Sequence, residues 1–290
     1  MIRVGSYEVA VLEIEKFRLD GGAMFGVVPR ALWEKEHPAD KRNRIRMVTR
    51  SLLVRGEGRV VLVDTGLGED WSAKELDLYG IESDASPLHR ALDAEGLAAG
   101  DVTDVIFSHL HFDHAGGAVR QDGDRLVASF PNARHYAQKD QLTWAESPTE
   151  KDRRSFRPHT LEPLKREGRF TSVRGVAEVA PGIHVEPTQG HTMGHQIVRI
   201  GEGEGAVVYC GDLIPTAAHV PAAWVMAYDL QPLVTMKEKR ALLERAAASG
   251  EILAIEHDPG CEAVRVAREG DGFKVVDRVT LGPPGNRGPS

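Results

Sequence analysis

The sequence predicts an α/β fold of the α+β type, in which short buried strands and helices are mixed along all 290 residues. One observation is a set of apolar, β-branched runs of the kind found in strands that helices cover on both faces, at residues 60–63, 105–108, 206–210 and 252–255. A second is a set of segments with apolar residues at helical spacing, at 87–98, 139–146 and 236–248. We expect Thr235 to cap the last of these helices. This mixture indicates a layered domain.

The composition is ordinary for a globular protein and excludes several classes of function. Apolar residues make up 41%, charged residues 27%, and the net charge is −7, which argues against a nucleic-acid partner. No run is long enough to span a membrane, and the N-terminus lacks the pattern of a signal peptide. Cys210 and Cys261 stand apart, outside any CxxC pattern, so we expect buried thiols and a cytoplasmic protein. One domain over residues 1–281, followed by a flexible tail at 282–290, is expected.

Polar residues follow all four predicted strands. Asp64, His109, Asp212 and His257 each come directly after, or within two residues of, an apolar run. Because sites in α/β proteins form where strand ends converge, we expect these side chains to meet at one edge of the fold.

The run from His109 to His114 holds four metal-binding groups within six residues: His109, His111, Asp113 and His114. Imidazole and carboxylate together suit zinc, iron, manganese or cobalt better than calcium or magnesium. The small residues at 115–117 allow the backbone to turn tightly after the run. Two first-row ions need about six ligating groups, and distant residues can complete the set: His191, Asp212 and His257. We therefore expect two divalent ions, preferably zinc, with a carboxylate at 212 able to bridge them.

These residues resemble, in type, order and spacing, the metal-binding pattern of the metallo-β-lactamase superfamily. The sequence after the first predicted strand, Asp64-Thr65-Gly66, is similar to a recurring element of that superfamily. The strings at 108–117 and 190–196, and the stretch from 212–216 to 256–258, look like its quorum-quenching N-acyl-homoserine lactone lactonase branch. The resemblance implies a four-layer αβ/βα sandwich with the site on one edge, between two sheets.

The resemblance also implies the role of each ligand. His109, His111 and His191 would bind the first ion, Asp113, His114 and His257 the second, and Asp212 would bridge both. His at position 111 supports the two-metal hydrolytic form, whereas Glu there would indicate di-iron oxygen-reducing relatives. Asp64 and His195 are expected to support ligands or loops rather than to bind metal.

The function implied is hydrolysis of a lactone ring, of an N-acyl-homoserine lactone or a related compound, by attack of a hydroxide that bridges the metals. Asp113 and Asp212 would be the catalytic residues, with Asp113 able to carry a proton to the leaving alkoxide. Three alternatives stay open: an organophosphate triester hydrolase like methyl parathion hydrolase, an iron-dependent oxidoreductase, and a non-catalytic metal-binding protein. The expected partner is a small lactone or ester, with no nucleic acid and no membrane; a homodimer is left open.

One departure concerns substrate binding. Some lactonases of this branch carry a Tyr three residues after the bridging Asp, and Pro215 stands there in this chain. The candidate substrate contacts are Met24, Phe25, His219, Trp224, Met226 and Tyr228, of which His219 or Tyr228 could replace the missing Tyr. The segment 20–26 is either a simple hairpin or a loop that overhangs the site, and 219–226 is either core or pocket wall. The polar segment 147–169 is expected to be an insertion, forming a flap, a cap or a dimer arm.

Overall fold

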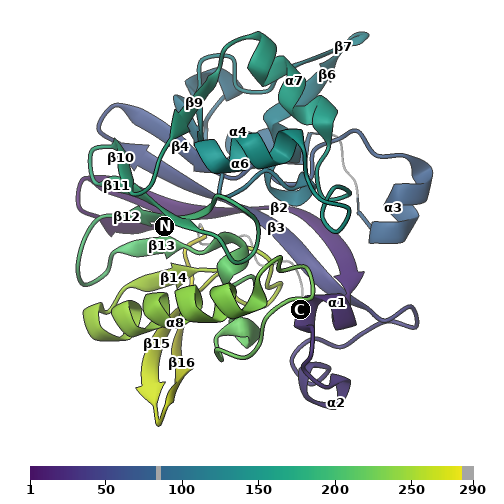
Figure 1. Ribbon diagram of the computed structural model, residues 1–290. Coiled ribbons are helices and arrows are strands. Elements are labelled where there is room, and N and C mark those ends of the chain that lie inside the picture. Colours follow the sequence, from purple (N-terminus) through teal and green to yellow (C-terminus); the bar gives the residue numbers. More distant parts are fainter. Residues whose placement is uncertain (83–85, 283–290) are drawn as a thin grey trace.

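The computed structural model describes residues 1–82 and 86–282, in which two seven-stranded sheets lie face to face (Figure 1). The first sheet contains, in spatial order, β1 (Ile2–Val4), β2 (Tyr7–Asp20), β3 (Arg44–Gly56), β4 (Arg59–Val63), β5 (Asp104–Ile106), β8 (Arg134–Gln138) and β9 (Phe170–Val173). The second contains β10 (Ala177–Ala180), β11 (Ile183–Thr188), β12 (His195–Ile200), β13 (Val207–Tyr209), β14 (Ile252–Ala254), β15 (Ala263–Glu269) and β16 (Gly272–Val279). A separate ribbon pairs β6 (Val119–Asp122) with β7 (Arg125–Ala128).

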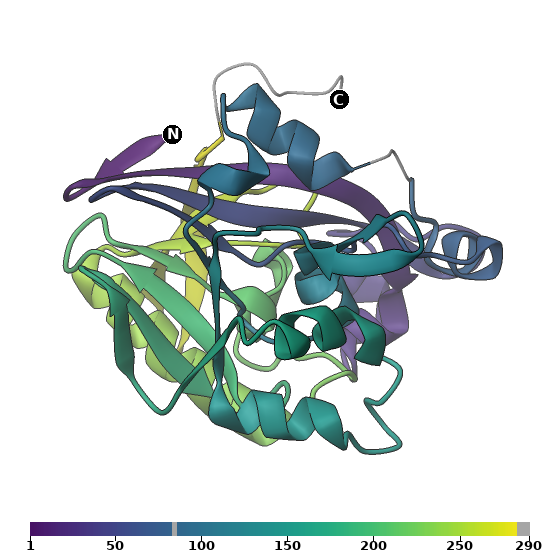
Figure 2. The same ribbon diagram turned by 90° about the horizontal axis from the view of Figure 1, so that it is seen from above.

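The described part of the chain contains eight α-helices, and the longer ones pack on the outer faces of the sheets. They are α1 (Gly21–Phe25), α2 (Arg30–Trp33), α3 (Ala73–Tyr79), α4 (Pro87–Ala94), α5 (Phe112–Ala115), α6 (Lys139–Glu146), α7 (Pro158–Arg166) and α8 (Pro232–Ser249). Figure 2 shows α4 outside the first sheet and α8 outside the second. Leu88 and Leu92 of α4 pack on the first sheet, and Leu242 and Leu243 of α8 pack on the second. The predicted four-layer sandwich is confirmed.

The inner layer of the sandwich is apolar. Val54 and Val61 of the first sheet share one buried cluster with Val198 and Val207 of the second. Burial of side chains on both faces explains why the strands that were predicted are continuous apolar runs rather than alternating ones. The two free cysteines, Cys210 and Cys261, are buried as predicted.

The order of the strands brings the ligand-bearing loops together. β4 pairs in parallel with β5, and β13 pairs in parallel with β14, so that Val63 lies opposite Ile106 and Tyr209 opposite Ala254. Parallel neighbours end at the same edge of their sheet. The loops that follow these four strands therefore meet, as the sequence predicts.

Helix boundaries differ from the prediction in two places. The last helix begins at Pro232, which suits the first helical position because its missing N–H would be unpaired there. Thr235 consequently lies inside α8, where its hydroxyl donates to the Gln231 carbonyl at 3.4 Å, and its predicted role as N-cap is wrong. The predicted helix at 87–98 ends earlier, at Ala94, because Gly96 takes the left-handed conformation with φ 72°.

Two uncertain segments take definite forms. Residues 20–26 are neither a hairpin nor an extended loop: Asp20 accepts the Ala23 N–H at 2.8 Å and begins the one-turn helix α1. The 147–169 segment contains turns followed by α7. The end of the predicted tail, residues 283–290, lies outside the described residues. Within the described ranges no helix is both long and apolar enough to cross a bilayer.

The first sheet contains a buried histidine, His135, that makes the stability of the fold depend on pH. His135 in β8 is fully buried beside the rings of Phe107 and Phe170, and this burial, with the charge of Arg169, lowers its pKa to about 4. The unfolded chain, with an ordinary histidine pKa, takes up a proton between about pH 6.5 and 4 that the folded chain does not take up. Stability contributed by the neutral ring is therefore lost as pH falls through that window.

Replacing His135 by Phe is expected to remove this loss. We compare the free energy of unfolding of the variant with that of the wild type at each pH. The difference, variant minus wild type, should be roughly 2–3 kcal/mol larger at pH 4.5 than at pH 7.5. Urea unfolding of both proteins at each pH measures this quantity. Other groups that titrate in acid affect both proteins equally, so a difference that is the same at both pH values would contradict the assignment.

Candidate metal centre

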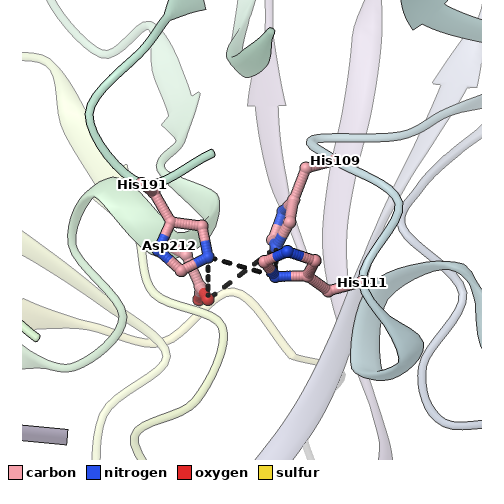
Figure 3. A group of neighbouring side chains, drawn as sticks. All are labelled: His109, His111, His191 and Asp212. Carbon is pink, nitrogen blue, oxygen red and sulfur yellow. Dashed lines mark hydrogen bonds and ion pairs between the residues drawn. The ribbon is translucent and has the colours of Figure 1, made fainter. Parts of the chain in front are cut away.

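The first group of converging side chains comes from three separate loops. His109 and His111 follow β5, His191 lies between β11 and β12, and Asp212 lies in the 3₁₀ turn Gly211–Leu213 after β13. In Figure 3, His109 and His111 point from one side toward His191 and Asp212 on the other. The Nδ1 atom of His111 lies 2.9 Å from His109 Nε2 and 3.2 Å from His191 Nε2. The Oδ2 atom of Asp212 lies 3.1 Å from His191 Nε2 and 3.8 Å from His109 Nε2.

The second group lies beside the first. Asp113 and His114 are in α5, and His257 follows β14. The Nε2 atoms of His114 and His257 are 3.3 Å apart, and each is 3.8 Å from an oxygen of Asp113. The second oxygen of Asp212, Oδ1, lies 3.6 Å from His114 Nε2 and 3.2 Å from His257 Nε2. One carboxylate thus presents one oxygen to each group.

The chemistry of these donors fits divalent cations. Three imidazole nitrogens converge on one point in the first group, and a neutral imidazole has only one N–H, so hydrogen bonds alone do not satisfy such a cluster. Asp212 Oδ1 is buried without a hydrogen-bond partner in the described part of the chain, although two imidazole nitrogens lie near it. Converging nitrogen lone pairs with a shared carboxylate are the donor set that zinc and its first-row neighbours prefer.

Outer contacts fix the rings of the converging histidines. The Nδ1 atom of His191 lies 2.9 Å from Asp229 Oδ1, and that of His257 lies 2.9 Å from the Val48 carbonyl. These contacts leave Nε2 of both rings facing the centre. His195 supports the centre differently: its Nε2 accepts the Asp212 N–H at 3.1 Å. The structure thus confirms the prediction that His195 holds the loop.

Two carboxylates share the outer nitrogen of His114. Asp64 Oδ2 and Glu256 Oε2 each lie 2.9 Å from His114 Nδ1, and all three residues are fully buried. Asp64 also accepts the Ser108 N–H at 2.7 Å through its other oxygen. Its predicted supporting role is confirmed. Asp64 has φ 58°, in the left-handed region that Asp adopts more often than most residues other than Gly.

Two of these supporting carboxylates, Glu256 and Asp229, were not predicted from the sequence. Glu256 directly precedes His257, so its place beside a predicted ligand was the available signal. Asp229 lies 38 residues after His191, the ring it contacts, and no local pattern connects the two.

Burial and opposite charge together shape the ionisation of the metal-free centre. Burial raises the pKa of the Asp212 carboxyl, but the surrounding imidazoles of His191 and His114 outweigh it and hold that pKa well below its usual range. Burial, followed by the charges of neighbouring histidines, keeps the pKa values of His109 and His111 well below normal. At His191 the effect of burial is outweighed by the charge of Asp212, which raises the pKa of that ring to about 9, so an ion bound there would displace a proton from it.

Glycines let the α5 loop approach the turn after β4. A Cβ atom on Gly116 would collide with the Leu67 carbonyl, and one on Gly117 with the Thr65 carbonyl. The Thr65 N–H also donates to the His114 carbonyl at 2.7 Å. The small residues that were predicted to allow a tight turn thus also allow close packing on the turn after β4, which helps to place His114 at the centre.

The candidate substrate contacts divide into two kinds. Met24, Phe25 and Met226 are buried in one apolar cluster, against which Trp224 packs. The ring of His219 stacks on Phe25 at 4.6 Å, and its nitrogens contact Thr216 Oγ1 at 2.7 Å and the Met24 carbonyl at 2.8 Å. His219 thus has both ring nitrogens engaged within the wall of the fold.

Tyr228 differs from the rest of that set. Its side chain is 37% exposed, and its hydroxyl has no hydrogen bond within the described residues. Burial of part of the ring raises its pKa, and the nearby carboxylates of Asp20, Asp113 and Asp212 add to that rise.

Comparison with known proteins agrees with this geometry. The sequence profile of the family described as the Metallo-beta-lactamase superfamily matches residues 45–257. A solved structure, a probable metal-dependent hydrolase from Staphylococcus aureus, superposes with a TM-score of 0.86 at 28% sequence identity, covering 96% of this chain and 100% of that chain.

Curated relatives are more distant. A protein named "Probable metallo-hydrolase" from Mycobacterium tuberculosis is 27% identical over 186 residues, which are 58% of this chain and 57% of that protein. An N-acyl homoserine lactonase from Bacillus thuringiensis is 29% identical over 166 residues, which are 54% of this chain and 60% of the lactonase. The chain thus matches little more than half the length of these relatives.

Proposed function

This chain belongs to the metallo-beta-lactamase superfamily, and we propose that it is a hydrolase that holds two divalent metal ions, preferably zinc. The observation that carries the proposal is the placement of Asp212, whose two oxygens face two separate groups of buried ligands. The first group would be His109, His111 and His191, and the second Asp113, His114 and His257. A structural zinc site closes around four ligands, and this centre offers seven.

The chain's own residues would prepare the reaction. When bound, two ions supply Lewis-acid polarisation of a carbonyl and lower the pKa of a bound water toward about 7. Asp212 holds the two groups in register and stays ionised among the imidazoles. The carboxylate of Asp113, in contact distance of both His114 and His257, is placed to take a proton and deliver it to the leaving alkoxide oxygen.

The substrate class we propose is a lactone, with an N-acyl-homoserine lactone as the leading candidate. Similarity to a Bacillus thuringiensis N-acyl homoserine lactonase supports this choice. The Tyr228 hydroxyl, which has no hydrogen bond within the described residues, would donate to the substrate carbonyl, in place of a side chain that Pro215 cannot supply. Half-buried aromatic rings of Trp71, Tyr79 and Phe112 form one cluster next to Asp113 and provide apolar surface for an acyl chain.

A substrate panel tests the proposal. The zinc-loaded protein would be assayed with a pH indicator on γ-lactones that carry acyl chains of increasing length, beside a paraoxon-type triester and a thioester. The Asp212→Ala variant sets the background for each compound. We expect kcat/KM to be highest on the lactones. If the triester is turned over while the lactones react only at the background rate, the substrate is a phosphotriester rather than a lactone. Background rates on every compound would contradict the proposal that the protein is a hydrolase.

A further inference from the structure

A polar segment between α6 and α7, residues 149–156, lies beside the metal centre; we call it the strap. Two side-chain hydrogen bonds hold its own turn. The Asp152 carboxylate, which is buried, accepts the Thr149 hydroxyl at 2.7 Å and the Trp144 indole N–H of α6 at 2.6 Å. The strap is therefore anchored to α6.

Lys151 of the strap forms hydrogen bonds with the loop that precedes α8. The Nζ atom of Lys151 donates to three consecutive backbone carbonyls, those of Ala227 at 2.9 Å, Tyr228 at 3.0 Å and Asp229 at 2.8 Å. An ammonium group has three N–H donors, and all of them are used here. These carbonyls lie outside the strands and helices, so the lysine fixes backbone that no ladder holds.

The loop before α8 also contacts a proposed metal ligand, His191. The Asp229 carboxylate contacts His191 Nδ1 at 2.9 Å, and the next residue, Leu230, donates its N–H to the His191 carbonyl at 3.0 Å. Lys151 thus binds the carbonyl of the same residue whose carboxylate contacts His191, and this carbonyl shares its peptide unit with the Leu230 N–H.

At a second point the strap touches the other side of the centre. The Ser155 carbonyl accepts the N–H of Phe112, the residue between His111 and Asp113, at 2.8 Å. The buried ring of Phe156 packs edge-on against the His111 ring, with 4.8 Å between ring centroids. Within eight residues the strap therefore contacts the loops that carry His111 and His191, which are 80 positions apart.

We propose that the strap couples these two ligand-bearing loops and that Lys151 is the positioning residue that holds Asp229 and, through it, His191. The inference rests on the proposed metal centre and not on the lactone substrate. Residues that orient ligating imidazoles contribute about 10–100-fold to metal affinity. Removing the ammonium group frees the three carbonyls and lets Asp229 leave the ring it orients.

The test compares Lys151→Met with Lys274→Met, a control whose ammonium makes one exposed contact, to Glu269 at 2.8 Å. Each metal-free protein is titrated with Co²⁺, and the visible absorption bands report the ligand geometry. We expect about tenfold weaker Co²⁺ binding and altered bands for Lys151→Met, with wild-type behaviour for the control. Wild-type affinity and bands in Lys151→Met, or an equal loss in the control, would overturn the inference.

A second measurement covers the case in which Lys151→Met fails to fold. In the wild-type protein, Zn²⁺ should slow amide hydrogen exchange in peptides that cover residues 149–156, although none of these residues is a proposed ligand. Unchanged exchange in the strap, with slowed exchange at 109–114, would overturn the coupling and leave the metal centre intact. A wild-type protein that binds no Co²⁺ would instead refute the metal centre, and the strap's role with it.

Discussion

Replacing Asp212 by Ala is expected to lower kcat/KM by roughly 10³-fold or more, a factor typical of losing preorganised electrostatic stabilisation in an active site. The variant loses the carboxylate whose two oxygens lie within 3.8 Å of four imidazole nitrogens, two in each ligand group. Its backbone N–H still reaches His195, so the loop after β13 keeps its anchor. We therefore expect a folded chain that has lost turnover rather than an unfolded one.

The control for this variant is Asp104→Asn. Asp104 is a buried carboxylate in β5, on the strand that precedes the ligand loop, where it pairs with Arg59 at 2.8 Å and contacts no proposed ligand. The folded fraction of this control should keep the wild-type kcat/KM, whereas Asp212→Ala should not. Steady-state kinetics on the zinc-loaded proteins, with circular dichroism to verify folding, provide the comparison. Activity within tenfold of the wild type in Asp212→Ala would refute the bridging role.

The second large effect is expected at Asp64, which has no direct place in the ligand set. Its carboxylate accepts the Ser108 N–H at 2.7 Å and the Ser108 hydroxyl at 2.5 Å, and it also contacts His114 Nδ1 at 2.9 Å. Asp64→Ala leaves the buried Ser108 N–H without its partner and places Ala at a left-handed φ of 58°. Glu256 then remains as the carboxylate beside His114 Nδ1. We expect the free energy of unfolding of the metal-free variant to be about 3 kcal/mol lower than that of the metal-free wild type.

Asp64→Asn separates the two roles of this carboxylate. Asn tolerates the left-handed backbone, and its amide oxygen can still accept the Ser108 N–H. It loses the negative charge against His114. We expect most of the stability to return, while affinity at the group Asp113, His114 and His257 stays about 10–100-fold lower than in the wild type. Urea unfolding and Zn²⁺ competition with a chelator measure both quantities. Wild-type binding of the second Zn²⁺ by Asp64→Asn would contradict this account of His114.

The parts of the site that the sequence predicts are those with a local signal. The run from His109 to His114 places four candidate ligands on one loop, and apolar runs before Asp64, Asp212 and His257 mark buried strand ends. Because β4 pairs in parallel with β5, and β13 with β14, the residues that follow these strand ends lie close together. The fold class follows from the same mixture of buried strands and helices.

Features that depend on long-range packing could not be predicted. Asp229 reaches His191 because the loop before α8 folds back over it, and Lys151 meets three carbonyls more than 70 residues away. Thr235 has the side chain of a good N-cap, but Pro232 begins the helix one turn earlier. Met24 and Phe25 lie in a short helix, begun by the cap at Asp20, that packs against Trp33, and no local pattern shows this packing.

Equilibrium dialysis of the metal-free protein against Zn²⁺ tests the central claim most directly, because it counts the ions that the two ligand groups hold. The account predicts saturation at two ions per chain for the wild type. Saturation at one ion, or no binding, would contradict the two-metal centre.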